Sequence, residues 1–147
     1  MKLVNKKAKR DYQILEEVEA GIVLSGGEVK SLRLGRGKVS EAFVKITEGE
    51  VWVNNLLIPA YQGKQEGYDP GKSRKLLLHR KEILSLQKKI EGKNLALVPL
   101  KVYLKGGKVK ITIALAKGKK QYEKKEAKKR KDMKRELGRQ FKEAQIR

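Results

Sequence analysis

The 147-residue sequence has no cysteine and a single histidine, His79. Without cysteine the chain has no disulfide, no thiolate metal ligand and no cysteine nucleophile, which suits a reducing compartment. His79 has no second imidazole or thiolate with which to complete a metal site. No nucleophile motif and no phosphate-binding glycine loop is present either. We therefore expect no metal, no cofactor and no catalytic residues, and a function other than that of an enzyme.

Long apolar runs are also missing. No stretch approaches the ~20 apolar residues of a membrane span, and the first residues, "MKLVNKKAKRDYQ", lack the apolar segment of a signal peptide. These absences predict a cytoplasmic protein with no membrane partner. We also expect a monomer.

What the chain has in excess is positive charge. It contains 37 Lys/Arg against 17 Asp/Glu, a net charge of +20. Such a surplus attracts polyanions, with nucleic acid the first candidate and an acidic membrane surface the second. Aromatic residues make up only 5%, which disfavours a single-strand binder that stacks many successive bases. Recognition of a folded RNA by its shape and phosphates fits better.

The charge is concentrated toward the end of the chain. Residues 117–147 hold 14 Lys/Arg and five Asp/Glu, whereas residues 1–116 hold 23 and 12. The net charge per residue about triples at Ala116, where the last predicted strand also ends. We predict an RNA-binding β-barrel domain over 1–116 and a basic tail over 117–147.

Apolar and polar residues alternate in several segments of the first domain, which predicts strands. Ser25 and Glu28 fit a capping box that starts a short helix ending at Gly35, and a second helix of about three turns should end at Gly92. Pro99 indicates an edge or a bulge. The predicted strands lie in 12–24, 42–46, 50–54 and in a hairpin over 95–116 around two glycines. Five or six strands with two or three peripheral helices favour a mainly β fold, a small antiparallel barrel of oligonucleotide-binding type.

Basic residues form three clusters in the first domain. Each cluster alone is typical of a solvated face, but several cations on one small barrel suit phosphate binding. The clusters are Lys6, Lys7, Lys9 and Arg10; Lys30, Arg33, Arg36 and Lys38; and Lys72, Arg74 and Lys75.

Three stretches together resemble the SsrA-binding protein (small protein B) family of bacterial trans-translation. They are "NKKAKRDYQILEEVEAGIVLSGGEVKSLRLG", "YDPGKSRKLLLH" and "LVPLKVYLKGGKVKITIALAKGKKQYEKKE". The resemblance runs from Asn5 to Glu126 in consistent order. It implies a barrel that binds the tRNA-like domain of transfer-messenger RNA and delivers this RNA, with elongation factor Tu, to stalled ribosomes. The tail would enter the vacant mRNA channel near the rRNA of the decoding centre.

Carried over by motif, the RNA-facing residues would be Asn5, Lys6, Glu19, Lys75, Leu77 and His79. To these we add Lys7, Lys30 and Arg33 from the basic clusters. Three of the residues have a second interpretation. Glu19 would accept from a base N–H or orient a lysine, Leu77 would touch a base or lie in the barrel, and His79 would be an ordinary helix-start residue. For Glu28 we prefer the capping role to an RNA contact.

The tail has good helix propensity but little apolar surface to bury, so it should be disordered when free and helical when bound. Gly118 would be a hinge and Tyr122 a stacking residue near the decoding centre. The predicted ribosome-binding residues are Lys117, Gly118, Lys119, Lys120, Tyr122, Glu123, Lys124 and Lys125.

Two other functions compete with this interpretation. One is a general rRNA-binding barrel with a basic extension, which composition alone does not separate from the first. The other is an RNA-processing enzyme, against which the missing metal and nucleophile motifs weigh. The ordered motifs favour the trans-translation factor.

Overall fold

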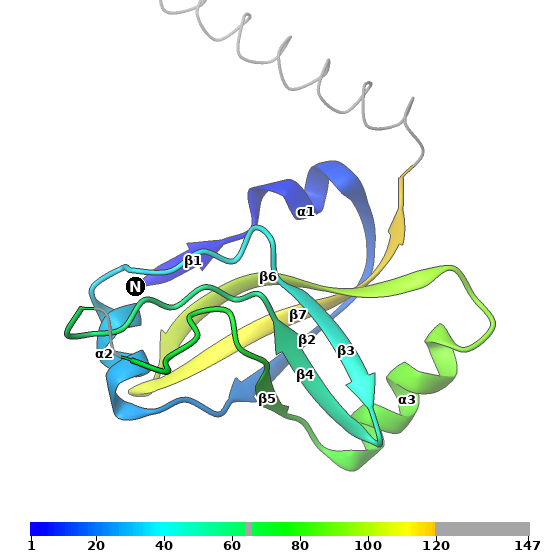
Figure 1. Ribbon diagram of the computed structural model, residues 1–147. Helices are drawn as coiled ribbons and strands as arrows, with labels where there is room; N and C mark the ends of the chain where they lie inside the picture. Colours follow the sequence, from blue (N-terminus) through cyan, green and yellow to red (C-terminus); the bar gives the residue numbers. More distant parts are fainter. Residues whose placement is uncertain (64–65, 120–147) are drawn as a thin grey trace, which may run out of the picture.

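The computed structural model describes residues 1–63 and 66–119, and Figure 1 shows the arrangement. Within these residues the chain forms three helices and seven strands. The helices are α1 (Lys6–Asp11), α2 (Gly26–Arg33) and α3 (Arg80–Ile90). The strands are β1 (Lys2–Val4), β2 (Tyr12–Ile22), β3 (Phe43–Thr47), β4 (Glu50–Asn54), β5 (Arg74–Leu77), β6 (Leu95–Lys105) and β7 (Lys108–Gly118).

The strands pair in the order β1-β6-β3-β4-β5-β2-β7, and β6 also pairs with β7. This extra pairing closes the sheet into a ring, with every pairing antiparallel. The closure is narrow at one place, since β3 and β6 meet at a single pair, Val44 with Leu97. The predicted small barrel is confirmed. The strands β1 and β5 and the helix α1 were not predicted, because three, four and six residues are too short for a period to emerge from the sequence.

Apolar side chains of alternate strand residues fill the barrel. Val51, Val53 and Ile111 are fully buried, and their neighbours on each strand point outward. Leu32 of α2 and Leu86 of α3 join the same core. Figure 1 shows these two helices at opposite ends of the barrel. They therefore cover its openings.

A smaller apolar cluster lies outside the ring, beneath α1. Ala8 of this helix packs against Ala114 and Ala116 of β7 and against Val98 and Leu100 of β6. Small residues on both sides let α1 lie close to the sheet. This helix thereby covers the outward side of β6 and β7 near the start of β2.

The two predicted hairpins are confirmed. In the β3–β4 turn, Glu48 and Gly49 have φ of 51° and 75°, the positive values that the tightest hairpin turns require. Gly106 and Gly107 turn β6 into β7 with φ of 59° and 78°. The predicted bulge is present too, since the β6–β7 register shifts between Pro99 and Lys101.

The last strand extends beyond the boundary that the sequence predicts at Ala116. β7 runs to Gly118, which pairs with Tyr12. The backbone N–H of Lys119 then donates to Asp11 O at 2.9 Å. Gly118 is therefore part of the sheet, and the prediction of a hinge at this residue is wrong.

Candidate nucleic-acid interface

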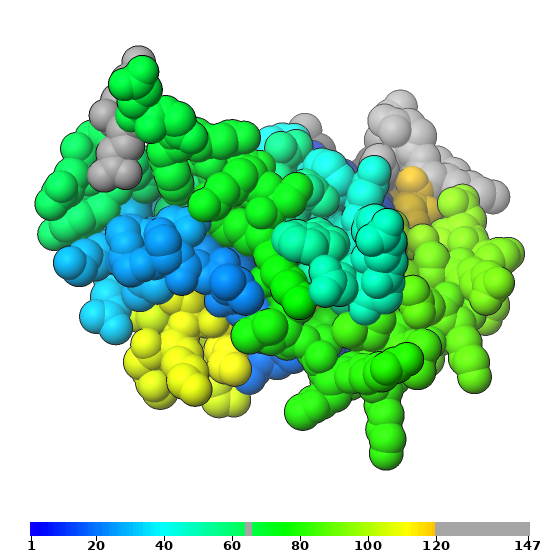
Figure 2. Space-filling model, turned by 60° about the horizontal axis from the view of Figure 1, so that its bottom comes forward, coloured from blue at the N-terminus to red at the C-terminus, as the bar shows by residue number. Residues whose placement is uncertain are grey.

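Outward side chains of neighbouring strands form rows across the barrel. Trp52 of β4 lies between Lys45 of β3 and Lys75 of β5 in the register. In the next row Leu77 of β5 pairs with Gly21 of β2. We call the outward residues of β3, β4, β5 and the end of β2 the outer face. Figure 2 shows the α2 region in blue, the segment around β5 in green and the β3–β4 hairpin in cyan adjoining one another on this side.

Leu77 is the most exposed apolar residue of the outer face, with 55% of its surface accessible. A Cβ at position 21 would lie 3.3 Å from the Leu77 Cβ, so the absence of a side chain at Gly21 leaves room for Leu77 beside β2. The alternative that Leu77 lies in the barrel interior is wrong. An exposed leucine on a basic surface suits an apolar contact with an unstacked base.

Glu19 also points outward, two residues before Gly21 on β2. The Tyr103 hydroxyl donates a hydrogen bond to its carboxylate, and the Lys105 ammonium lies 3.3 Å from the other oxygen. The Tyr103 hydrogen bond, followed by the lysine, lowers the pKa of Glu19. Glu19 does orient a lysine, as one of the two alternatives states. Its carboxylate is also held ionised and can accept from a base N–H at the same time.

Lys75 forms an ion pair with Glu50 of β4, with 3.1 Å between the ammonium and the carboxylate. Both side chains are more than 40% exposed, so the pair is weak in water. A phosphate can therefore compete for the Lys75 ammonium at little cost.

The helix α2 begins as predicted. Ser25 Oγ accepts from the Glu28 N–H, and the Glu28 carboxylate accepts from the Ser25 N–H at 3.0 Å, so the capping box is confirmed. Lys30 and Arg33 are exposed on this helix. The Lys30 ammonium lies 5.4 Å from the centre of the Tyr61 ring, within cation–π range.

Arg74 corrects the third basic cluster. It was predicted to lie on the surface beside Lys75, yet only 2% of it is exposed. Its Nε lies 2.5 Å from the Glu28 carboxylate, and its other nitrogens donate to Leu56 O at 2.6 Å and Pro70 O at 2.9 Å. Arg74 alternates with Lys75 along β5 and so points inward, which adjacency in the sequence conceals.

The carboxylate partner of Arg74 is held ionised. Burial would raise the pKa of Glu28, but the Ser25 N–H and the Arg74 guanidinium together lower it. Tyr68 joins the group, because its hydroxyl donates to Ile58 O at 2.6 Å and accepts from Arg74 at 3.3 Å. We call Glu28, Tyr68 and Arg74 the buried network. It fastens the segment between β4 and β5 to α2.

Asn5 differs from its prediction. Only 5% of it is exposed, its backbone N–H donates to Leu100 O and its side-chain amide donates to Pro99 O at 2.8 Å. The prediction that it faces outward is therefore wrong, because its two N–H donors hold the chain against β6, while its side-chain oxygen is buried without a partner among the described residues. Lys6 and Lys7 are exposed on α1, and Lys7 pairs with Glu41 at 2.6 Å. These lysines lie at the other end of β2 from Leu77.

His79 is exposed and is the N-terminal cap residue of α3, as its second interpretation states. Its backbone N–H donates to Glu82 Oε1 at 3.1 Å. The imidazole lies two residues beyond Leu77, at the edge of the outer face. The helix-start interpretation of His79 is therefore confirmed, and its contact with RNA stays a prediction.

The first tail residues are tied to α1. Lys117 is exposed at the end of β7, and the Lys119 ammonium donates to Lys9 O at 3.1 Å. The other predicted tail residues lie outside the described residues: Lys120, Tyr122, Glu123, Lys124 and Lys125. The predicted helix of the tail lies there too.

In the described part of the chain, no group of three or more His, Asp or Glu side chains is placed to hold a metal ion. None of the three helices in residues 1–63 and 66–119 is long and apolar enough to span a membrane.

Comparisons with known proteins give a consistent result. A family described as SmpB protein matches residues 2–143. The chain is 57% identical over 139 residues to the SsrA-binding protein of Sulfurihydrogenibium sp. (strain YO3AOP1), covering 94% of this chain and 91% of that protein. It is 51% identical over 142 residues to the SsrA-binding protein of Bacillus cereus (strain ATCC 10987 / NRS 248), covering 96% and 92%.

A solved structure is similar as well. Its description reads "tmRNA-SmpB: a journey to the center of the bacterial ribosome". The matching chain has a TM-score of 0.68 and 44% sequence identity, and the match covers 86% of this chain and 93% of that one.

Proposed function

The chain belongs to the SmpB protein family, and we propose that it is an RNA-binding factor of trans-translation. It binds transfer-messenger RNA and acts with it on stalled ribosomes, so that incomplete proteins are tagged and the ribosomes are released. The observation that carries the proposal is the outer face of the barrel. There an exposed leucine, a weakly paired lysine and an ionised glutamate lie on two paired strands.

Each of these three side chains supplies a different contact to a folded RNA. Lys75 binds a backbone phosphate, which contributes affinity through the release of counterions. Leu77 packs against an unstacked base. Glu19 accepts from a base amino or imino group, a contact that no lysine can make. Because the Tyr103 hydroxyl fixes the carboxylate, Glu19 contributes selectivity at a set position.

Basic residues around the outer face extend the contact with phosphates. Lys30 and Arg33 lie on α2, which begins four residues after β2 ends, and His79 borders Leu77. Lys6 and Lys7 of α1 reach a more distant part of the same RNA. Asn5 acts indirectly, by holding the start of α1 against β6.

The remaining parts of the proposal concern the tail and the partners. The tail beyond Lys119 enters the empty mRNA channel, folds there and signals that no codon is present. Elongation factor Tu takes part in the delivery complex. The protein works in the cytoplasm as a monomer and acts by binding, with no chemistry of its own. Since Lys119 is fastened to α1, the tail leaves the barrel from a fixed point.

A truncation tests this division of labour. A chain ending at Lys119 keeps every pairing of β7 and should bind the tRNA-like domain of transfer-messenger RNA with nearly full affinity. On stalled ribosomes it should fail to support peptide transfer to the alanylated RNA. Loss of RNA binding in this variant, with the circular dichroism of the barrel intact, would contradict the assignment of the RNA to the barrel.

A further inference from the structure

Trp52 is the one tryptophan of the chain and lies at the centre of the outer face. It is half-buried on β4, with Lys45 and Lys75 as its direct neighbours on the strands at either side. An aromatic residue with a lysine on each neighbouring strand is a combination suited to an unpaired nucleotide, because a base has a π-face and its phosphate is anionic. Neither the family resemblance nor the basic clusters pointed to this residue.

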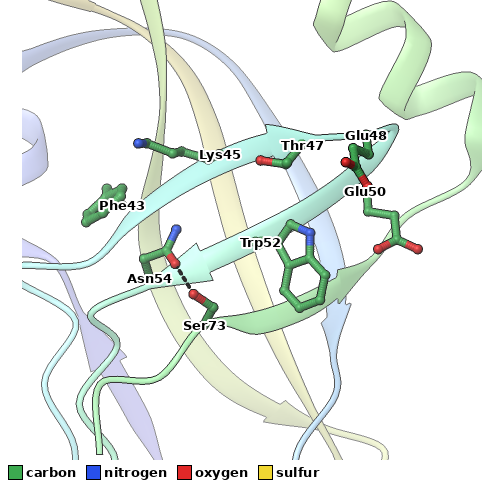
Figure 3. A pocket seen from close by; sticks show the side chains of 8 residues that line it. All are labelled: Phe43, Lys45, Thr47, Glu48, Glu50, Trp52, Asn54 and Ser73. Atoms are coloured by element: carbon green, nitrogen blue, oxygen red, sulfur yellow. Dashed lines mark hydrogen bonds between the residues drawn. The ribbon is translucent and has the colours of Figure 1, made fainter.

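The ring forms part of a shallow hollow of about 500 Å³. Figure 3 shows the indole between two ends of different character. At one end, Phe43 and Lys45 lie near Asn54, and the Lys45 ammonium is 5.6 Å from the centre of the Phe43 ring. At the other end, beside the β3–β4 turn, are the carboxylates of Glu48 and Glu50.

The different charges at the two ends of the hollow favour one orientation of a bound molecule. The Glu48 carboxylate repels a phosphate, whereas Glu50 already holds the Lys75 ammonium at 3.1 Å. Both carboxylates can accept hydrogen bonds from base N–H groups. Lys45 and Phe43 suit a phosphate and a sugar or second base at the other end. An acidic peptide would meet Glu48 and Glu50, and a basic peptide would meet Lys45. A nucleotide satisfies both ends because it carries its N–H donors and its negative charge on opposite sides.

We propose that this hollow binds one unpaired nucleotide of the RNA, with the base stacked on Trp52 and the phosphate at Lys45. The proposal rests on the proposed function, because it adds a contact to the same RNA. Trp52 of the hollow pairs with Lys75, which stands two residues before Leu77 on β5, so one RNA strand can contact both the hollow and Leu77. Scarce aromatic residues are compatible with this arrangement, since only one base needs to stack.

The fluorescence of the full-length protein tests the proposal directly, because all indole emission comes from position 52. The tRNA-like domain of transfer-messenger RNA, labelled at one end, is titrated and its binding is followed by anisotropy of the label. Stacking should quench the Trp52 emission and lower its accessibility to acrylamide, with the same midpoint as the anisotropy.

Substitutions give a second measurement. W52L keeps an apolar side chain without an aromatic face and should weaken RNA binding at least about fivefold, while W52F should lie between W52L and the unaltered protein. K45Q should weaken binding, whereas K93Q, at an exposed lysine after α3, should not. Circular dichroism and melting curves establish that each variant is folded.

The outcomes separate this inference from the proposed function. Anisotropy that reports binding while Trp52 emission and acrylamide quenching stay unchanged would overturn the nucleotide site and leave the proposed function standing. Normal RNA affinity of folded W52L would overturn it as well, and loss of ribosome association by that variant would then assign the hollow to a contact with the ribosome. Absence of any binding to the RNA would overturn the proposed function itself.

Discussion

Arg74 and Lys75 are neighbours on β5, and both form ion pairs with a glutamate, yet the two pairs serve different ends. Arg74 points into the fold, where its pair with Glu28 is almost completely buried. Lys75 points outward, where its pair with Glu50 is nearly half exposed. A buried pair cannot lose one partner without leaving a charge in the interior, whereas an exposed pair can exchange its partner for an RNA phosphate. The pleat of the strand thus buries one cation in the fold and leaves the next accessible to an anion.

The largest effect should come from breaking the buried network. Arg74→Met leaves the buried Glu28 carboxylate with only the partly exposed Lys72 ammonium, 3.7 Å away, and should lower the free energy of unfolding by about 3–5 kcal/mol. The matched outward change, Lys75→Met, should lower it by less than about 1 kcal/mol. Urea denaturation of both variants measures the difference. Equal losses would show that the two faces of β5 do not differ in the way described.

The outward residue should control RNA affinity instead. Lys75→Gln removes one phosphate contact, so the slope of log affinity against log salt should become shallower by about 0.7 to 0.9. Affinity at low salt should fall several-fold while the urea midpoint stays constant. Titrations of transfer-messenger RNA at four salt concentrations measure the slope, with Lys93→Gln as the control. An unchanged slope would remove Lys75 from the phosphate contacts.

The loss of stability at low pH should depend more on Glu28 than on Glu19. The folded-state pKa of Glu28 is lowered, so the stability that it contributes is present above its unfolded value of about 4.3 and is lost as the pH falls through the folded value. We expect the urea midpoint to drop below about pH 4.3, and to drop less steeply in a Glu28→Gln variant. A Glu19→Gln variant should keep more of the drop, because solvent screens the exposed Glu19 carboxylate and its lowered pKa contributes less to stability. Identical pH profiles for all three proteins would contradict this.

The smallest effect concerns the outward carboxylate alone. Tyr103→Phe removes the hydroxyl that does most to lower the pKa of Glu19. The pKa should therefore rise toward the ordinary glutamate value, as followed by NMR of the Glu19 side-chain carboxyl. Thermal stability should barely change. A Glu19 pKa that stays where it was would show that Lys105 and Lys110 suffice to lower it.

Much of this fold follows from local pattern. Strict alternation predicted both hairpins, and Ser25 with Glu28 predicted the start of α2, because capping and pleating depend on residues close in sequence. The rest depends on which strands become neighbours. Arg74 looked like part of a basic run until Glu28, 46 residues away, proved to be its partner. Trp52 became notable only when the register placed Lys45 and Lys75 on either side of it.

The candidate site shows the same limit. The family resemblance led to Glu19, Lys75 and Leu77, and the register brings them onto paired strands. It also led to Asn5, whose burial no local pattern reveals, because its partners lie on β6. Tyr103 was missed for a similar reason, since it is 84 residues from Glu19. When the partners of a side chain are distant in the sequence, its role can be recognised only from the fold.

The most direct test of the central claim is chemical labelling of lysines with and without RNA. The full-length protein is treated with an amine-reactive reagent alone and with a saturating amount of the tRNA-like domain of transfer-messenger RNA, and each site is quantified by mass spectrometry. We predict strong protection of Lys45 and Lys75 on the outer face and little protection of Lys88 and Lys93 near the end of α3. Protection of Lys88 and Lys93, with Lys45 and Lys75 as reactive as in the free protein, would contradict the claim that RNA binds the outer face.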